Sequence, residues 1–126
     1  MQFKVLLPRG ARGKARFLRE GKAAARVRHR HVVDVIDVGE CDLGLYLVME
    51  LVGGGTLASR VPRPGEADIE TALAWLLPVV SAVAAAHAAG VVHRDLKPSN
   101  ILAEHDARSG ITTKVSDFGI SKLVGE

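Results

Sequence analysis

The chain has 126 residues and a formal net charge of +3 at pH 7. Because 48% of its residues are hydrophobic and 25% are charged, the composition excludes an intrinsically disordered chain and indicates a globular domain with a sizeable core. The single cysteine, Cys41, excludes a disulfide framework and a cysteine-based metal site. It favours a reducing, cytoplasmic setting.

The first half of the chain is expected to contain a strand, a helix and a hairpin, in that order. A short apolar strand is predicted for residues 3–7, and a helix for residues 11–28, where the apolar side chains follow helical spacing. Two further strands are predicted for residues 32–38 and 43–51. The turn residues 39–42 between them indicate a hairpin.

Nine of the basic residues crowd the segment from Arg9 to Arg30. Such a run can bind nucleic acid, in which case its binding to any DNA would depend steeply on salt. The solvated face of a helix explains the same run, and we favour that interpretation. Nucleic acid is therefore not an expected partner.

The segment from Thr71 to Val92 contains no Asp, Glu, Lys or Arg. This uncharged segment is long enough to span a bilayer. A helix over residues 68–89 that is buried on every side explains the same pattern, with Gly90 as its C-terminal stop. We favour the buried helix, because alanine is the most frequent residue of the segment and the segment contains Pro78. A membrane is not an expected partner of this chain.

Two motifs carry the chemistry. The run His93-Arg94-Asp95-Leu96-Lys97-Pro98-Ser99-Asn100 is followed by Asp117-Phe118-Gly119, with a predicted strand pair at 101–103 and 112–115 between them. Phosphoryl transfer to a hydroxyl needs an Asp beside the attacking oxygen, and an Asn and a second Asp to hold metal. The two motifs supply these three side chains in the required order.

On these motifs the chain resembles the eukaryotic-like Ser/Thr protein kinases, including their bacterial members. The resemblance implies an α+β, two-lobed kinase-like fold of which residues 1–126 form a part. In that fold residues 1–52 would form a partial N-lobe, residues 53–57 a hinge and linker, and residues 58–126 the start of the C-lobe. It also implies ATP and Mg²⁺ as cofactors, and a protein Ser or Thr hydroxyl as the acceptor.

The resemblance assigns a role to each polar residue of the two motifs. Asp95 would accept or orient the substrate hydroxyl proton, and Lys97 would contact the transferring phosphate. Asn100 and Asp117 would hold Mg²⁺, because hard oxygen ligands suit that ion.

A second pair is implied near the start of the chain. Lys4 would bind the α- and β-phosphates and would pair with Glu20 on the following helix. The match rests on the second half of the family's V-A-I-K strand, represented here by Phe3-Lys4-Val5-Leu6.

The segment 47–52 resembles the strand and hinge that hold adenine. Met49 would be the gatekeeper, and backbone groups of Glu50 and Val52 would bind the base edge. Leu102 would form the floor beneath the adenine. The glycines 53–55 follow the hinge, so they do not correspond to a phosphate-binding loop.

The family's glycine-rich loop and its A-P-E motif are expected to fall outside these 126 residues. On that basis we expect the polypeptide alone to be poorly stable and to transfer phosphate slowly or not at all. The alternative is a non-catalytic kinase remnant that acts as a nucleotide-binding or protein-interaction module. Small-molecule phosphotransferases carry a related catalytic Asp, but the run from His93 to Asn100 with Lys97 favours a protein kinase.

Overall fold

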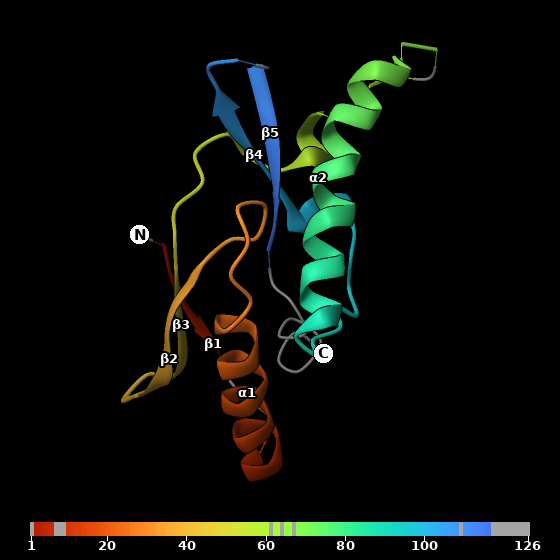
Figure 1. Cartoon of the computed structure of the whole chain (residues 1–126). Coiled ribbons are helices and arrows are strands. Elements are labelled where there is room, and N and C mark those ends of the chain that lie inside the picture. The colour runs from red at the N-terminus through yellow and green to blue at the C-terminus, as the bar shows by residue number, and fades with distance from the viewer. Residues whose placement is uncertain are drawn as a thin grey trace.

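A computed structural model describes residues 2–6, 10–60, 62–63, 65–66, 68–108 and 110–116, with only the backbone described for residues 2–6 and 10–12. The chain forms two parts that share one core (Figure 1). The first part contains β1 (Gln2–Leu6), α1 (Gly10–Ala25), β2 (Val35–Cys41) and β3 (Gly44–Met49). The second contains α2 (Ile69–Ala88), β4 (Ile101–Asp106), β5 (Gly110–Val115) and the short 3₁₀ helices Leu57–Arg60 and Pro98–Asn100. The predicted α+β class is confirmed.

The first part is a three-stranded antiparallel sheet in the order β1-β3-β2, with α1 packed against it. The predicted hairpin is present, with Cys41 paired to Gly44 at its end. The strand predicted at 32–38 begins only at Val35. Residues 31–33 instead run along β5, where the Val115 N–H donates to the His31 carbonyl (2.8 Å) and the Val33 N–H donates to the Val115 carbonyl (2.9 Å).

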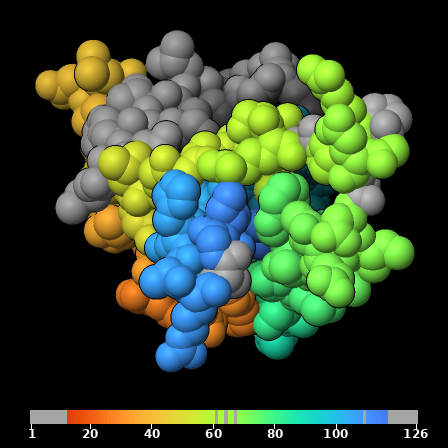
Figure 2. Space-filling view, turned by 90° about the horizontal axis from the view of Figure 1, so that it is seen from above, coloured from red at the N-terminus to blue at the C-terminus, as the bar shows by residue number. Residues whose placement is uncertain are grey.

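The β4–β5 hairpin of the second part confirms the predicted strand pair, and it is bound on both of its edges. Residues 31–33 cover the β5 edge, while on the other edge the Ala103 N–H donates to the Gly55 carbonyl (2.8 Å). Figure 2 shows the hairpin, in blue, between the yellow segment around residue 50 and the green α2. Because both covering segments lead directly out of the first sheet, they fix the hairpin relative to that sheet.

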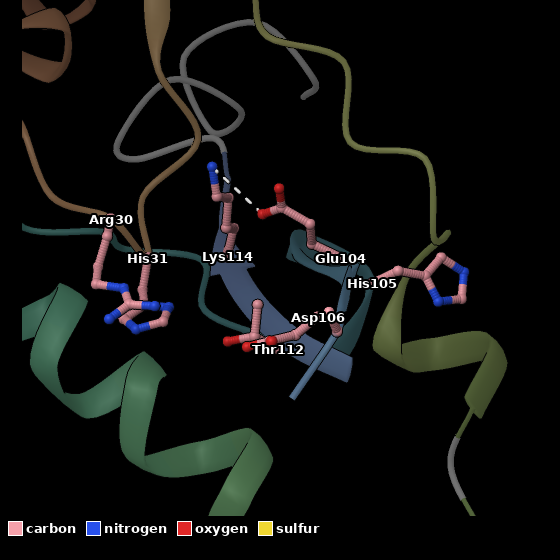
Figure 3. A pocket seen from close by; sticks show the side chains of 8 residues that line it. Arg30, His31, Glu104, His105, Asp106, Thr112 and Lys114 are labelled. Carbon is pink, nitrogen blue, oxygen red and sulfur yellow. Dashed lines mark ion pairs between the residues drawn. The ribbon is translucent and has the colours of Figure 1, made fainter. Parts of the chain in front are cut away.

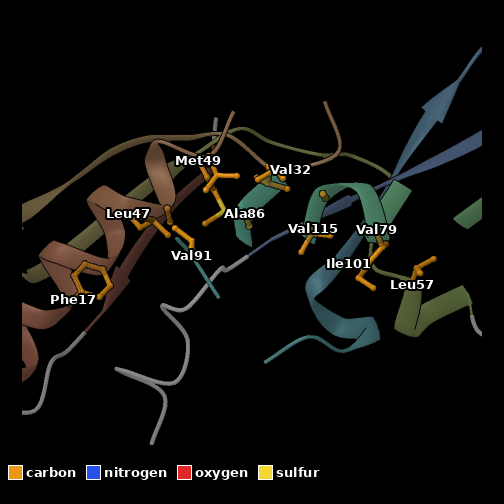
Figure 4. Packing of buried hydrophobic residues seen from close by; sticks show 14 of the residues in the cluster. Phe17, Val32, Leu47, Met49, Leu57, Val79, Ala86, Val91, Ile101 and Val115 are labelled. Atoms are coloured by element: carbon orange, nitrogen blue, oxygen red, sulfur yellow. The ribbon is translucent and has the colours of Figure 1, made fainter. Parts of the chain in front are cut away.

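One hydrophobic cluster runs through both parts (Figure 4). The first part contributes Phe17 of α1 and Leu47 of β3, and the β4–β5 hairpin contributes Ile101 and Val115. Burial of a large apolar side chain contributes about 1.5–3 kcal/mol, so this shared cluster is the main force that joins the two parts.

Helix α2 starts at the N-cap Asp68, whose carboxylate accepts the Glu70 N–H (3.1 Å), and it is followed by Gly90 with φ of 80°. The prediction that this helix is buried on every side is wrong. Its buried residues are Val79, Ala82 and Ala86, whereas its exposed large apolar residues are Ile69, Leu73, Leu76, Leu77 and Val80. Among the described elements, β5 makes the main contact with α2, and it covers only one face of the helix. By length and composition alone, α2 could also cross a membrane.

The described part of the basic segment, from residue 14 on, is mostly solvated, whereas the side chains of Arg9 and Arg12 lie outside the described part of the chain. The Arg and Lys residues at positions 16, 19, 22, 26, 28 and 30 are exposed. Lys14 is paired with Glu40 of β2.

Gly54 lies where the chain passes closest to β4. A Cβ at this position would clash with the carbonyl oxygen of Ala103, whereas a Cβ at Gly53 would meet no atom within 4 Å. We expect Gly54→Ala to destabilise the chain by about 1–3 kcal/mol, because the backbone on both sides must shift. The matched variant Gly53→Ala should change stability by less than about 0.5 kcal/mol. Urea unfolding of both variants checks this, and equal effects would contradict the close approach.

His31 lies at the β5 edge, where its Nδ1 is 3.1 Å from the Thr113 carbonyl. Burial lowers the pKa of this ring; the hydrogen bond to Thr113 opposes that effect, and the charges of Arg30 and Lys114 add to the lowering. A lowered folded-state pKa means that stability is fully present above the unfolded value of 6.5 and is lost as the pH falls below it.

We therefore expect His31→Gln to make stability less dependent on pH between about pH 7.5 and about pH 5. Urea unfolding at several pH values measures this dependence. His105→Gln, which replaces an exposed histidine of β4, is the control. If His31→Gln leaves the pH dependence of the unfolding free energy unchanged, the His31 ring does not contribute to that dependence.

Candidate active site

The loop from His93 to Asn100 follows the buried anchor Val91, and it is shaped by the His93 ring. His93 is 3% exposed. Its Nδ1 accepts the backbone N–H of Asp95 (3.1 Å), which leaves the proton on Nε2 for donation to the Ser116 carbonyl (2.6 Å). Arg94 between them has φ of 72°, a left-handed conformation that is unfavourable for a side chain of this size. The two hydrogen bonds of His93 support that turn.

The three polar residues predicted for this loop lie together. The amide nitrogen of Asn100 donates to the Asp95 backbone carbonyl (2.8 Å) and lies 3.4 Å from the Asp95 carboxylate. Lys97 Nζ is 3.4 Å from the same carboxylate, whose side chain is 23% exposed. The structure therefore places a carboxylate beside a cation at an accessible position. With the nitrogen of Asn100 directed to the loop, its amide oxygen is the atom that suits a hard metal ion.

Ser116 joins the loop to the segments around it. Its N–H donates to the Asn100 carbonyl (2.9 Å), its carbonyl accepts from His93, and its hydroxyl lies 4.0 Å from the Met49 sulfur. Ser116 is 5% exposed. Ser116, the residue before Asp117, is therefore fixed against the loop 93–100. Asp117 itself, with Phe118 and Gly119, lies outside the described residues, so its predicted role as a metal ligand stays a prediction.

The hinge candidates occupy the edge between the two parts. Met49 is buried at the end of β3, and the next residue, Glu50, donates its N–H to the Asp34 carbonyl (3.0 Å). Val52 and Leu102 are partly buried against the core, and residue 102 forms a bridge to Thr56, within the predicted hinge and linker 53–57. The arrangement brings the predicted gatekeeper, hinge and floor around the same end of the core.

The predicted Lys4–Glu20 pair is not tested, because the side chain of Lys4 lies outside the described part of the chain. The backbone of Lys4 pairs with Leu47 in the sheet. Glu20 Oε1 lies 3.9 Å from Nη2 of Arg94, the residue before Asp95. Helix α1 therefore contacts the catalytic loop through Glu20.

Sequence reasoning missed the part that Lys114 plays beside the hinge. Its Nζ lies 3.0 and 3.1 Å from the two carboxylate oxygens of Glu50 and 3.4 Å from Glu104. The available signal was a lysine in an otherwise apolar or β-branched strand, three residues before Asp117. Over the described ranges, no group of three or more His, Cys, Asp or Glu residues is placed to hold a metal.

Comparison with known proteins identifies the same pattern over nearly the whole chain. Residues 3–126 match the family model described as the protein kinase domain. The chain is 40% identical over 112 residues to a probable serine/threonine-protein kinase PknB of Lactococcus lactis, which covers 89% of this chain. It is also similar to the crystal structure of the Mycobacterium tuberculosis PknI kinase domain, with a TM-score of 0.76 and 34% identity over 94% of this chain.

A third similarity is to a crystal structure of Rad53 in complex with AMP-PNP, with a TM-score of 0.71 and 32% identity. That match covers 82% of this chain and 28% of the Rad53 chain. The matched stretch amounts to 17% of the Lactococcus protein and 48% of the PknI chain. The chain thus spans under a fifth of that curated relative and under half of that solved domain.

The central position of His93 leads to a stability prediction. His93→Phe keeps the volume and the burial but leaves the Ser116 carbonyl and the Asp95 N–H without this partner. Each lost partner costs about 1–3 kcal/mol, so we expect a loss of at least about 1 kcal/mol. The neighbouring variant Val92→Ala, at a residue that is 56% exposed, should change stability by less than about 0.5 kcal/mol. Urea unfolding compares the two, and similar values would contradict the role given to His93.

Proposed function

The chain belongs to the protein kinase domain family, and from this membership we propose that it supplies the nucleotide- and metal-binding part of a Ser/Thr protein kinase. The proposed reaction is transfer of the γ-phosphoryl group of ATP to a protein Ser or Thr hydroxyl. The name of the Lactococcus relative supports the acceptor, and the nucleotide complex of Rad53 supports ATP as the donor. The observation that carries the proposal is the convergence of His93, Asn100 and Met49 at Ser116, directly before Asp117.

In this proposal Asp95 and Lys97 act on the reacting groups. The Asp95 carboxylate accepts the proton of the substrate hydroxyl while the hydroxyl oxygen attacks the γ-phosphorus and the bond to the β–γ bridging oxygen breaks. Lys97, 3.4 Å from that carboxylate, places its positive charge where the phosphoryl oxygens gain negative charge.

Asn100 and Asp117 are the proposed metal ligands. The amide oxygen of Asn100 and the carboxylate of Asp117 would hold Mg²⁺, which neutralises phosphate charge when it is bound. The fit is supported by the hydrogen bond that directs the Asn100 nitrogen toward Asp95 and so presents the oxygen on its other side.

The adenine would lie against the hinge. Backbone groups of Glu50 and Val52 would bind its edge, Met49 would close the back of the slot, and Leu102 would form its floor. The proposal keeps Lys4 with Glu20 as the phosphate-binding pair. The Glu20–Arg94 distance of 3.9 Å is long for an ion pair, so Glu20 can exchange partners at little cost.

The domain division follows from these assignments. Residues 1–52 would belong to the N-lobe, residues 53–57 to the hinge and linker, and residues 58–126 to the C-lobe. A cytoplasmic location and a protein substrate are parts of the same proposal.

Metal-dependent nucleotide binding tests the proposed function. We expect the chain to bind ATP more tightly with Mg²⁺ than without it, and Asp117→Ala to lose that gain because it removes a carboxylate ligand. Isothermal titration with and without Mg²⁺ measures both. Asp42→Ala, at an exposed Asp in the β2–β3 turn, is the matched control and should keep the gain.

Two outcomes would contradict the proposal. Absence of ATP binding by the unaltered chain would favour a remnant that serves as a protein-interaction module. A gain from Mg²⁺ that persists in Asp117→Ala would place the metal elsewhere.

A further inference from the structure

Lys114 and Glu50 form an ion pair in which the lysine nitrogen contacts both carboxylate oxygens. The Lys114 side chain is only 15% exposed. Burial lowers the pKa of Lys114, but the hydrogen bond and charge of Glu50, followed by those of Glu104, outweigh it, so the net pKa is raised. The lysine is therefore charged and held in one geometry.

Glu50 is itself fixed to the link between α1 and β2. Its Oε1 accepts the Asp34 N–H (2.9 Å), and its own N–H donates to the Asp34 carbonyl (3.0 Å). Three segments thus meet at one carboxylate: the link at residue 34, the hinge at residue 50 and strand β5 at residue 114. A partly buried carboxylate with these contacts resists displacement, because moving it leaves the Lys114 charge and the Asp34 N–H unpaired.

The position of Lys114 in the hairpin gives this contact a functional consequence. In the register of the hairpin, Lys114 lies directly opposite Leu102, the proposed adenine floor, so both side chains lie on the same face. Asp117 follows three residues later, and three residues of extended chain span at most roughly 10 Å. Lys114 therefore connects the proposed adenine-binding segment to the strand that leads to the proposed metal ligand.

We propose that Lys114 is a positioning residue for the nucleotide, because its ion pair with Glu50 holds the adenine-binding hinge at a fixed distance from the metal-binding end of β5. This inference rests on the proposed function and adds a residue to it. A nucleotide must contact the hinge and the metal at once, and a displacement of either support by about 1 Å can cost up to about 100-fold in a tightly oriented site.

Glu104 provides a natural comparison within the same cluster. Figure 3 shows Lys114 and Glu104 on the wall of a pocket of about 390 Å³ that is also lined by Arg30, His31 and Thr112. Glu104 is more exposed than Glu50 (43% against 28%), lies farther from Lys114 (3.4 Å), and is on β4 rather than on the hinge. Its loss should leave the connection between hinge and β5 intact.

The test measures ATP affinity of the full chain with and without Mg²⁺ for Lys114→Met, Lys114→Arg, Glu50→Gln and Glu104→Gln. Lys114→Met keeps the length of the side chain without its charge, and Glu50→Gln keeps an oxygen for the Asp34 N–H. We expect Lys114→Met to reduce the gain in affinity from Mg²⁺ by about tenfold while metal-free ATP affinity stays unchanged, and Glu50→Gln to reduce that gain by a similar factor. Lys114→Arg should restore most of the gain, because a guanidinium also contacts both carboxylate oxygens. Glu104→Gln should keep it.

A merely structural role predicts a different result. In that case Lys114→Met would lower the melting temperature and weaken metal-free and metal-dependent ATP binding together, which would overturn the proposal. If Lys114→Met does not fold, Glu50→Gln decides the question by its gain in ATP affinity from Mg²⁺. A normal gain from Mg²⁺ in Glu50→Gln would overturn the positioning role alone, whereas absence of ATP binding by the unaltered chain would overturn both it and the proposed function.

Discussion

The hydrogen bonds around Ser116 are the constraint on which the rest of the site depends. This buried residue receives one bond from His93, gives one to Asn100 and places its hydroxyl beside Met49. Buried backbone groups without partners are costly, so none of these segments can move away alone without leaving a carbonyl or an N–H unpaired. The end of β5, the loop 93–100 and the end of β3 are consequently held in one arrangement, although they lie far apart in the sequence.

A second set of contacts holds the β4–β5 hairpin in place and so positions Ser116 at the end of β5. Residues 31–33 and 55–56 border the hairpin on its two edges, and both lead directly out of the three-stranded sheet. The Lys114–Glu50 ion pair also joins β5 to the segment that follows β3. The two parts of the chain are therefore connected through hydrogen bonds and charges at the hinge as well as through the shared hydrophobic core.

Sequence periodicity and motifs predicted the elements well where one local signal dominated. The helix after β1, the β2–β3 hairpin, α2 with its Gly90 stop and the β4–β5 pair all occur where turn residues and apolar spacing placed them. The structure brings Asp95, Lys97 and Asn100 together, as the motif in residues 93–100 led us to expect, while their catalytic roles stay a prediction. Residues 32–33 were assigned to the wrong sheet, because an apolar run does not indicate which of two strands it will pair with.

Two further features depend on tertiary context that a linear pattern does not contain. The composition of α2 predicted burial on every side, but how much of a helix is covered depends on the elements packed against it, and in the described chain β5 covers one face. The importance of Lys114 was also hidden, because a lysine in a strand is most often solvated. Its partners, Glu50 and Glu104, are 64 and 10 residues away in the sequence.

The claim that the catalytic loop and the end of β5 share one metal-bound nucleotide can be measured directly. Mn²⁺ in place of Mg²⁺ broadens the NMR signals of nearby backbone amides. When ATP is present, our account predicts selective broadening of the amides of Asp95, Asn100 and Ser116, with those at the start of α2 unaffected. Broadening centred on another surface, or equal broadening without ATP, would contradict it.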